Sequence, residues 1–375
     1  MRLLYIANIR IPTEKAHGLQ IVKTIEALES IGAYVKLLVP SRKNHIKTNI
    51  ADFYNISGIN HLVKVFDIAR PLQYISERIY FPFQRLWFGI VAFVYALFWR
   101  GTIYSRDITV SFLLSLFGKQ VMYEDHEPKN RFRWIYGFFL RHIPKKVIVA
   151  QNLVEQYQEM NMKKASYVLA PNGVDVKEFD EVNPDKSLWN RKFRITENNP
   201  VTLYVGHFYK WKGVYTLLDA AKDIRGEVVL IGGTKEDYES VEQYIKERSI
   251  SNVHLHKFMP HKEVIKYIKS ADILVLPNTA TEVRSQKYTT PIKLFEYMAS
   301  GVPIIASNVL SFTPYLRNKK NALLCEPDNP SDLARAVNQA LQDRYSFGKL
   351  AQSARESVNQ YTWDSRVRKI VDFME

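Results

Sequence analysis

The residues best suited to chemistry lie in one stretch, 289–303, which reads TTPIKLFEYMASGVP. Its apolar residues recur at helical spacing, and a helix that begins at Thr290 or Pro291 would leave free N–H groups at its start. Such a helix start favours phosphate, because the N–H groups and the helix dipole both attract negative charge. Lys293 lies in the first turn, where a bound anion would offset its charge. Glu296 lies one turn further, within reach of a sugar hydroxyl on the same ligand.

The elements around this stretch predict a parallel sheet. Apolar runs on either side of it are typical of buried strands, and Gly301 supplies a C-terminal stop for the helix between them. The same alternation of strand and helix patterns fills the chain, which implies a doubly wound α/β architecture. Strands are expected at residues 3–7, 34–39, 62–66, 102–104, 120–123, 146–150, 167–170, 201–205, 228–231, 253–255, 273–276, 304–306 and 322–324. Helices in the first half are expected near 18–32, 82–100, 108–117, 129–142 and 152–160.

The 289–303 stretch resembles the nucleotide-sugar signature of GT-B glycosyltransferases, specifically the retaining family 4. The resemblance implies that Glu296 holds the ribose of the donor nucleotide and that loop amides before the helix hold the diphosphate and the sugar. The family usually has a second Glu eight positions earlier. Tyr288 stands at that position here, so the resemblance leaves the donor sugar open.

Further loops in the second half carry the same resemblance. The family commonly has Gly-Arg and then Lys-Gly after the strand at 201–205, and both cations grip the diphosphate. This chain keeps Lys212 and has His207 in place of the Arg. Gly232 ends another strand and allows close approach of a ligand. The donor-binding residues implied in this half are Gly206, His207, Gly232, Phe258, Met259, Thr290, Pro291, Ile292, Lys293 and Glu296.

Two positions in the first half complete the resemblance. Gly18 lies where the second element begins, and the resemblance implies that it faces the donor diphosphate across an interdomain cleft. His126 follows an expected strand, at the edge where open parallel sheets bind ligands. Its neighbours Glu124, Asp125 and Glu127 should raise the pKa of His126 and favour the imidazolium form. The family's histidine here contacts the donor sugar, so the catalytic residues implied are His126, Lys212 and Glu296.

Composition limits the class of protein. A length of 375 residues suggests two domains, and 46% hydrophobic residues argue against disorder. The single cysteine, Cys325, excludes a disulfide framework. The net charge is +14, and residues 1–150 carry 21 lysines and arginines against 10 acids, or +11. This excess indicates an anionic partner, such as lipid headgroups, nucleic acid or a phosphorylated acceptor, or simply a solvated surface. Together with the resemblance, it leads us to expect no nucleic acid partner.

An apolar run at residues 86–99 bears on the location of the protein. With 14 residues the run is too short to cross a bilayer unaided, and a core helix is favoured over a membrane-facing one. Met1 leads directly into an expected strand, without the pattern of a signal peptide. We therefore expect a cytoplasmic protein, with a peripheral position on the inner face of the membrane as the alternative.

The sequence therefore predicts a GT-B glycosyltransferase with two Rossmann-like domains. Residues 1–180 form the expected acceptor domain, 181–360 the expected donor domain, and a C-terminal helix at 361–375 packs back on the first. The expected reaction moves a sugar, with retention, from a nucleoside diphosphate sugar to a glycan, lipid-linked or other hydroxyl acceptor, in surface polysaccharide or glycolipid synthesis. Without a D-x-D motif, no metal and no cofactor are expected. The alternatives are a nucleotide-sugar epimerase and a non-catalytic protein that binds sugar nucleotides or lipid surfaces.

Overall fold

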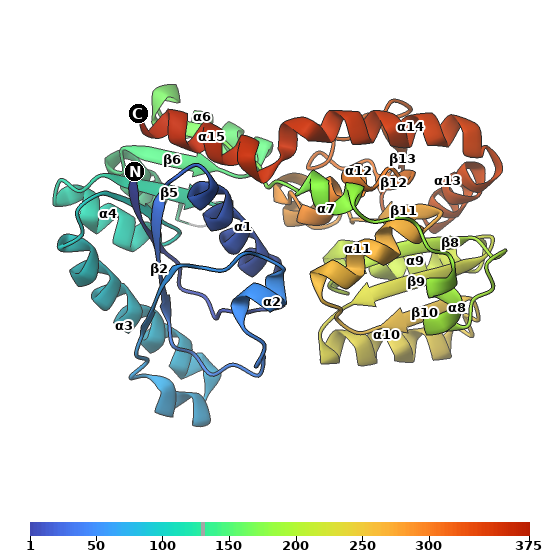
Figure 1. The fold of residues 1–375 in the computed structure, drawn as a ribbon, viewed down its shortest axis with the longest axis horizontal. Helices are drawn as coiled ribbons and strands as arrows, with labels where there is room; N and C mark the ends of the chain where they lie inside the picture. The colour runs from blue at the N-terminus through green and yellow to red at the C-terminus, as the bar shows by residue number, and fades with distance from the viewer. Residues whose placement is uncertain (129–131) are drawn as a thin grey trace. The chain divides into compact units, whose positions relative to one another are not determined.

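The computed structural model describes residues 1–128 and 132–375. These residues form two compact units (Figure 1). Unit 1 comprises Met1–Pro171 and Trp363–Glu375, and unit 2 comprises Asn172–Thr362.

Unit 1 is built on a seven-stranded parallel sheet in the order β3-β2-β1-β4-β5-β6-β7. Its strands are β1 (Arg2–Ile6), β2 (Tyr34–Pro40), β3 (His61–Val65), β4 (Thr102–Ser105), β5 (Val121–Asp125), β6 (Lys145–Ile148) and β7 (Tyr167–Leu169). Its helices are α1 (Ala16–Ser30), α2 (Ile50–Tyr54), η1 (Arg70–Tyr74), α3 (Glu77–Leu97), α4 (Ile108–Leu116), α5 (Arg133–His142), α6 (Gln151–Glu159), η2 (Lys164–Ser166) and α15 (Trp363–Met374). The strand order reverses between β1 and β4, so the loops that follow these two neighbouring strands lead away from each other at this place on the sheet edge.

Unit 2 repeats this plan with a six-stranded parallel sheet in the order β10-β9-β8-β11-β12-β13. Its strands are β8 (Val201–Gly206), β9 (Glu227–Gly232), β10 (Val253–His256), β11 (Ile273–Leu276), β12 (Ile304–Ser307) and β13 (Leu323–Cys325). Its helices are α7 (Val176–Asp180), α8 (Ser187–Phe193), η3 (Lys210–Lys212), α9 (Val214–Ala221), α10 (Lys235–Glu247), α11 (His261–Ser270), η4 (Arg284–Tyr288), α12 (Ile292–Ser300), α13 (Pro330–Gln342), α14 (Arg344–Ser357) and η5 (Val358–Tyr361). Its switch point lies between β8 and β11.

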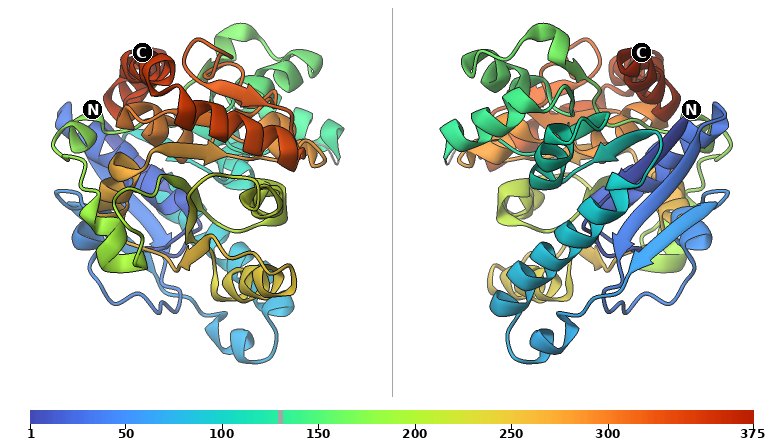
Figure 2. Two further views of the ribbon diagram at one scale, coloured as in Figure 1. Left: turned by 90° about the vertical axis from the view of Figure 1, so that its right-hand side faces the viewer. Right: turned by 90° about the vertical axis from the view of Figure 1, so that its left-hand side faces the viewer.

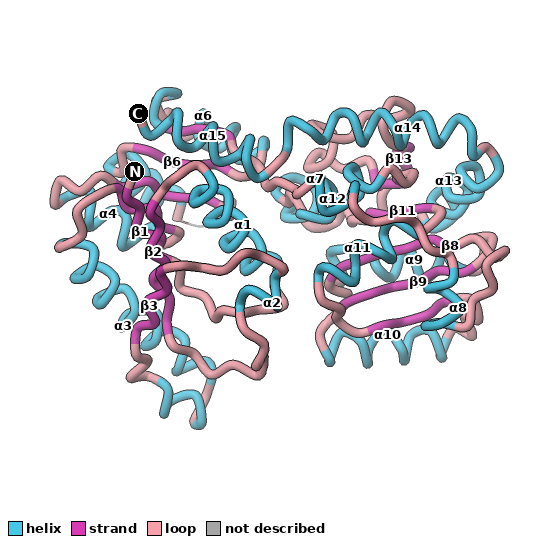
Figure 3. The backbone as a smooth tube through the Cα atoms, viewed as in Figure 1, coloured by secondary structure: helices cyan, strands magenta, loops and turns pink. Residues whose placement is uncertain are grey.

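Burial on both faces explains why the strands were readable as continuous apolar runs. In β11, Leu274 and Leu276 pack in one core while Ile273 and Val275 pack in another on the opposite face. The fold class is therefore confirmed, and each expected strand is present with small shifts at its ends. The tube in Figure 3 shows the strands of each unit side by side, joined by helices and loops.

The division of the chain differs from the expected boundary after residue 180. Helix α7 contacts α11 and α12, and Trp189 of α8 is buried in the unit 2 core, so unit 2 begins at Asn172 rather than after residue 180. The C-terminal helix α15 contacts α1 and β7 and belongs to unit 1. The expected helix at 129–142 is described only from Arg133, because residues 129–131 lie outside the described residues.

Helix α3 differs from both alternatives set out for the apolar run. It begins at Glu77 rather than at residue 82, with the Ser76 side chain accepting a hydrogen bond from the N–H of Arg78. One stripe of the helix is buried: Tyr80, Gln84, Phe88, Ala92 and Ala96. The opposite stripe is apolar and exposed: Ile79, Phe83, Leu86, Ile90 and Val94. The right-hand view of Figure 2 shows α3 in front of the unit 1 strands. Helix α3 therefore has the buried face expected of a core helix and also an exposed apolar face, which the membrane-facing alternative would require.

Candidate functional site

Two loops meet at the switch point of unit 2, where open parallel sheets bind their ligands. They follow the neighbouring strands β8 and β11. The N–H of Thr279 in the second loop lies 3.4 Å from the carbonyl oxygen of Trp211 in the first. Gly213 has a φ of +70°, and a Cβ there would lie 1.7 Å from the carbonyl oxygen of Pro277. Only glycine allows the two loops to approach so closely.

Two cations flank one indole ring at this edge. The ammonium of Lys212 lies 4.3 Å from the ring centroid of Trp211, and the guanidinium of Arg284, from the other loop, lies 5.5 Å from it. Within the described parts of the chain, no carboxylate is within ion-pair distance of either cation. Burial, and then the charge of Arg284, lower the pKa of Lys212 to about 7. Two close cations without a counter-ion form a site suited to a diphosphate.

His207 lies in the same loop as Lys212 and is held by stacking. Its ring lies 4.9 Å from that of Tyr209 at an interplanar angle of 10°, and Tyr209 stacks in turn on Trp211 at 5.9 Å. The structure therefore brings His207 into the same aromatic stack as the Lys212–Arg284 pair. The stack fixes the loop, because stacked rings resist rotation and exclude water.

Helix α12 presents Glu296, whose side chain is buried and already held from two sides. Lys293 Nζ donates to Oε2, and Oε1 lies 3.0 Å from Nε2 of His261. The other ring nitrogen of His261 lies 3.5 Å from a carboxylate oxygen of Glu178. Burial acts to raise the pKa of Glu296, but Lys293 and His261 outweigh it and lower the value to about 2. Glu296 is therefore an ionised, oriented acceptor. In this structure the charge of Lys293 is offset by this carboxylate.

The start of α12 lies slightly later than expected. The first helical residue is Ile292, with Pro291 at the N-cap. The carbonyl oxygen of Thr290 accepts a hydrogen bond from Asn172 Nδ2 at 2.8 Å, which ties this loop to the beginning of unit 2. The N–H groups of the first turn, including that of Lys293, remain the backbone donors of this helix start.

The other expected donor residues have varied surroundings. A Cβ on Gly232, where φ is +129°, would lie 2.2 Å from the carbonyl oxygen of Gly206, so the ends of β8 and β9 require this glycine for their own packing. Phe258 is 42% exposed at the surface. Met259 is buried, and its side chain packs in the unit 2 core.

A second polar cluster lies in unit 1, around the buried carboxylate of Glu124. Tyr5 donates to this carboxylate at 3.2 Å and Gln20 donates at 2.6 Å, while Arg366 Nη2 lies 3.3 Å from Oε1. His126, directly after β5, contacts the same oxygen through Nε2. His126 is therefore positioned at the carboxyl end of the sheet, as predicted. The acids before it are not in a loop: Glu124 and Asp125 belong to β5 and are buried.

The expected imidazolium state of His126 is wrong. Burial and the positive charge of Arg106 lower the pKa of His126 to about 4, although Glu124 acts in the opposite direction. The same two causes lower the pKa of His17 in α1 to about 3. Glu124 acts to raise the pKa of His126, but burial and Arg106 outweigh it. The pKa of Glu124 itself lies well below its usual range despite its burial, because Arg366, His126 and Arg106 favour its charged form.

The packing around Gly18 explains why a glycine is needed at this position, which the sequence did not reveal. It lies inside the first turn of α1, where its N–H donates to the carbonyl oxygen of Lys15. A Cβ there would lie 2.2 Å from the hydroxyl of Tyr54 and 2.5 Å from Cγ2 of Thr13. Tyr54 in turn donates to the carbonyl oxygen of Thr13 and accepts from its N–H. The side of Gly18 that lacks a Cβ is therefore occupied by this hydrogen-bonded pair.

Comparison with known proteins agrees with this architecture. Residues 185–360 match the family model described as glycosyl transferases group 1. The chain is 24% identical to an uncharacterized glycosyltransferase of Methanocaldococcus jannaschii, over 98% of this chain and 95% of that protein. These matches identify a glycosyltransferase enzyme, and its fold is that of the GT-B glycosyltransferases. A lipopolysaccharide 1,2-N-acetylglucosaminetransferase of Salmonella typhimurium is 23% identical over 61% of this chain and 62% of its own length.

Solved structures resemble this glycosyltransferase along its whole length. Sucrose-phosphate synthase from Thermosynechococcus elongatus has a TM-score of 0.79 at 18% identity, over 99% of this chain and 97% of that chain. An Anabaena protein in complex with UDP and glucose has a TM-score of 0.75 at 15% identity, over 99% and 98% of the two chains. The solved structures show the fold, whereas the family model and the Methanocaldococcus relative support glycosyl transfer over epimerisation and over a non-catalytic protein.

Three arginines of the glycosyltransferase were not predicted from the sequence as site residues. Arg284 and Arg106 follow strands that flank the two switch points, so their places after β11 and β4 were a usable signal. Arg366 gave no such signal. It lies in the last helix, and its contact with Glu124 joins residues far apart in the sequence.

Proposed function

We propose that this glycosyltransferase binds a nucleoside diphosphate sugar in unit 2 and transfers the sugar, with retention, to a hydroxyl of a glycan or lipid-linked acceptor. The observation that carries the proposal is the Lys212–Arg284 pair beside Trp211 at the sheet's switch point, with no carboxylate within ion-pair distance among the residues that the structure describes. A nucleoside diphosphate leaving group gains negative charge as the glycosidic bond breaks, and fixed cations stabilise that charge. Anabaena neighbours solved with UDP and with UDP-glucose support this ligand class.

The proposed roles follow from the geometry of each group. Lys212 and Arg284, with His207 beside them, hold the diphosphate and stabilise it as it departs. Glu296 accepts hydrogen bonds from the ribose, because its carboxylate is ionised and already oriented. Neutral His126 orients the donor sugar through a hydroxyl. We propose that no metal and no cofactor take part, since these cations supply the positive charge the leaving group needs.

We further propose a cytoplasmic enzyme at the inner face of the membrane, in surface polysaccharide or glycolipid synthesis. The exposed apolar stripe of α3 supports a peripheral contact, since it is larger than a scatter of single residues. Among the described residues, α3 is a helix long and apolar enough to cross a membrane, but its opposite stripe packs in the unit 1 core. A lipopolysaccharide transferase among the relatives is consistent with such a pathway.

The test is release of UDP from UDP-glucose in the presence of a membrane extract. Lys212→Ala should lower the rate by about 100-fold or more, as expected when a charge partner of the transition state is lost. Lys222→Ala removes the same charge from an exposed position of unit 2 and should leave the rate unchanged. Equal rates for the two variants would overturn the diphosphate role of Lys212. The anomeric configuration of the product, read by NMR, tests retention.

A further inference from the structure

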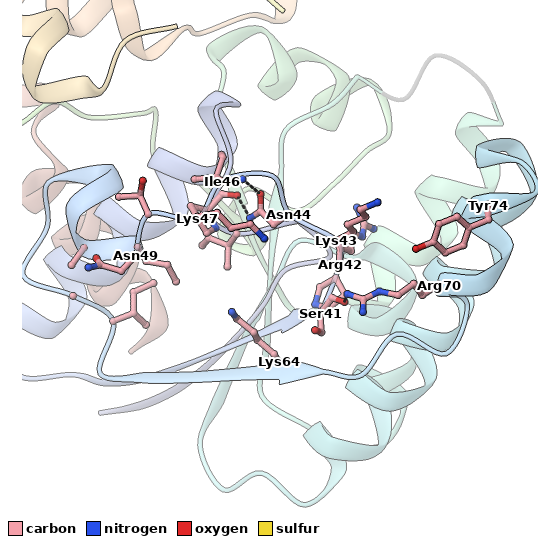
Figure 4. Close-up of a pocket in the computed structure, with 18 residues that line it drawn as sticks. Ser41, Arg42, Lys43, Asn44, Ile46, Lys47, Asn49, Lys64, Arg70 and Tyr74 are labelled. Atoms are coloured by element: carbon pink, nitrogen blue, oxygen red, sulfur yellow. Dashed lines mark hydrogen bonds between the residues drawn. The ribbon is translucent and has the colours of Figure 1, made fainter.

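Unit 1 contains a cavity of about 780 Å³ that the proposed donor site does not use (Figure 4). It lies beyond the carboxyl ends of β2 and β3, beside the loop that follows β1. Its lining includes residues of the loops that follow β1 and β2, Lys64 of β3 and two residues of η1, Arg70 and Tyr74. Figure 4 shows the side chain of Lys64 rising from β3 toward the loop that carries Asn44 and Lys47.

The lining is strongly basic. It includes the cations Arg42, Lys43, Lys47, Lys64 and Arg70, and it includes no aspartate or glutamate. None of the five has a carboxylate within ion-pair distance in the parts of the chain that the structure describes. Cations gathered in a concave site repel one another unless an anion joins them, and the concave shape concentrates their field.

Neighbouring groups hold two of the cations in place. Arg42 Nη2 donates to Asn8 Oδ1 at 2.6 Å and also contacts Gln84 Oε1, and its Nε is buried without a hydrogen-bond partner. Arg70 Nη2 donates to the carbonyl oxygen of Ser41 at 3.3 Å. Asp67 acts on Arg42 only from beyond ion-pair distance, and its carboxylate already accepts from the hydroxyl of Tyr80. The site is thus partly preorganised, which lowers the entropic cost of binding an anion.

We propose that this cavity, named here the basic pocket, binds the phosphate or diphosphate group of the acceptor. That the phosphate belongs to the acceptor rests on the proposed function, whereas phosphate binding itself rests on the pocket alone. The basic pocket and His126 lie at the same edge of one sheet, the pocket at β2 and β3 and His126 at β5. An anchor in the pocket would therefore fix one end of an acceptor on the ligand-binding side of unit 1.

Two sources could supply this phosphate: a soluble sugar phosphate or a lipid-linked phosphate at a bilayer. Tyr74 of the pocket belongs to η1, which contacts α3, and its side chain is 78% exposed. The exposed apolar residues Ile75 and Ile79 come next along the chain, and Ile79 belongs to the exposed stripe of α3. A lipid chain whose phosphate lies in the pocket would therefore have the apolar face of α3 in its neighbourhood.

Lysine footprinting on the full chain tests the pocket without turnover. Acetylation by an N-hydroxysuccinimide ester, read by mass spectrometry, reports each lysine separately, so phosphate bound in unit 2 does not interfere. Inorganic pyrophosphate should slow acetylation of Lys47 and Lys64 by about fivefold or more, as expected for charge-assisted contacts. Lys163 and Lys164 are exposed in the same unit and serve as internal controls. Vesicles of phosphatidylglycerol and of phosphatidylcholine form the second arm.

The outcomes separate the two sources and the two proposals. Protection by pyrophosphate assigns a soluble phosphate, and protection only by phosphatidylglycerol vesicles assigns a headgroup at a bilayer. Protection by neither probe would overturn the pocket, even if UDP release from UDP-glucose proceeds. Lys47→Gln/Lys64→Gln should weaken binding of the protective probe by about tenfold. Lys163→Gln/Lys164→Gln, with the same loss of charge, should change it by less than about twofold; equal losses in both double variants would also overturn the proposal.

Discussion

At the scale of single residues, Glu296 is the proposed ribose contact, and its surroundings already hold and orient it. Its carboxylate is ionised and held by Lys293 and His261. Glu296→Gln keeps the shape but removes the charge, and we expect a loss of about 2–4 kcal/mol in the binding free energy of UDP, because a charged hydrogen-bond acceptor is lost. Calorimetry measures this. Glu178→Gln changes only the far side of His261 and should cost much less. Unchanged UDP affinity in Glu296→Gln would refute the ribose contact.

The protonation of Lys212 on ligand binding provides a second measurement. With a pKa lowered to about 7 by burial and by Arg284, the side chain is only partly charged near neutral pH. A bound diphosphate favours the ammonium form and raises this pKa, so binding above pH 7 should take up a proton. Calorimetric enthalpies of UDP binding at pH 8 should therefore vary with the ionisation enthalpy of the buffer. The dependence should disappear in Lys212→Met and persist in Lys222→Met. A wild-type enthalpy that is equal in all buffers would contradict the prediction.

His126 should stay neutral at physiological pH, contrary to what its acidic neighbours suggest. Its pKa of about 4 lies below the value of about 6.5 for an unfolded histidine. As the pH falls from 6.5 to 4, the unfolded chain binds a proton that the folded chain does not, so His126 lowers the stability of the fold in this window. An NMR titration of its ring should show no protonation between pH 5.5 and 8, limits chosen about one unit or more above that pKa. A titration midpoint of the His126 ring above pH 6 would contradict this prediction and favour the imidazolium form.

At the scale of elements, the packing of α1 against α2 decides what Gly18 does. Gly18→Ala places a methyl group 2.2 Å from the Tyr54 hydroxyl, and overpacking of this kind costs about 1–3 kcal/mol of folding free energy. Tyr54→Phe removes that oxygen, so Gly18→Ala should cost less in the Tyr54→Phe background than in the wild type. Denaturant unfolding of the four proteins measures the coupling. If Gly18 serves only the donor, Gly18→Ala will lower UDP-glucose turnover with no loss of stability and no coupling to Tyr54.

At the scale of the whole molecule, the sequence predicted best those features that depend on residues close to one another in the chain. Strands buried on both faces were legible because every residue in a run such as 273–276 had to be apolar. Glu296 was found because a phosphate-binding helix start has its own pattern. Contacts between distant segments left no such pattern. The pairing of Arg366 with Glu124 and the meeting of Arg284 with Trp211 depend on topology, and so does the charge state of His126.

Helix α3 and the basic excess of residues 1–150 together predict how the whole enzyme meets a membrane. Exposed apolar side chains on α3 would enter the interface, and each Lys or Arg near an anionic surface adds about 1 kcal/mol, screened by salt. Sedimentation with vesicles should therefore show binding to anionic but not to neutral lipid, and weaker binding at high salt. Leu86 and Ile90 are 62% and 50% exposed, and burial of such a side chain contributes about 1.5–3 kcal/mol.

Leu86→Ser/Ile90→Ser should accordingly abolish sedimentation while leaving the net charge unchanged. Leu310→Ser/Tyr345→Ser removes two exposed apolar side chains, 50% and 74% exposed, from unit 2 and should sediment as the wild type does. If the α3 variant still binds and only salt releases it, the contact is electrostatic and α3 lies outside the interface. If the wild type does not bind anionic vesicles at low salt, the exposed face of α3 has another partner, and the basic excess serves a soluble anionic acceptor.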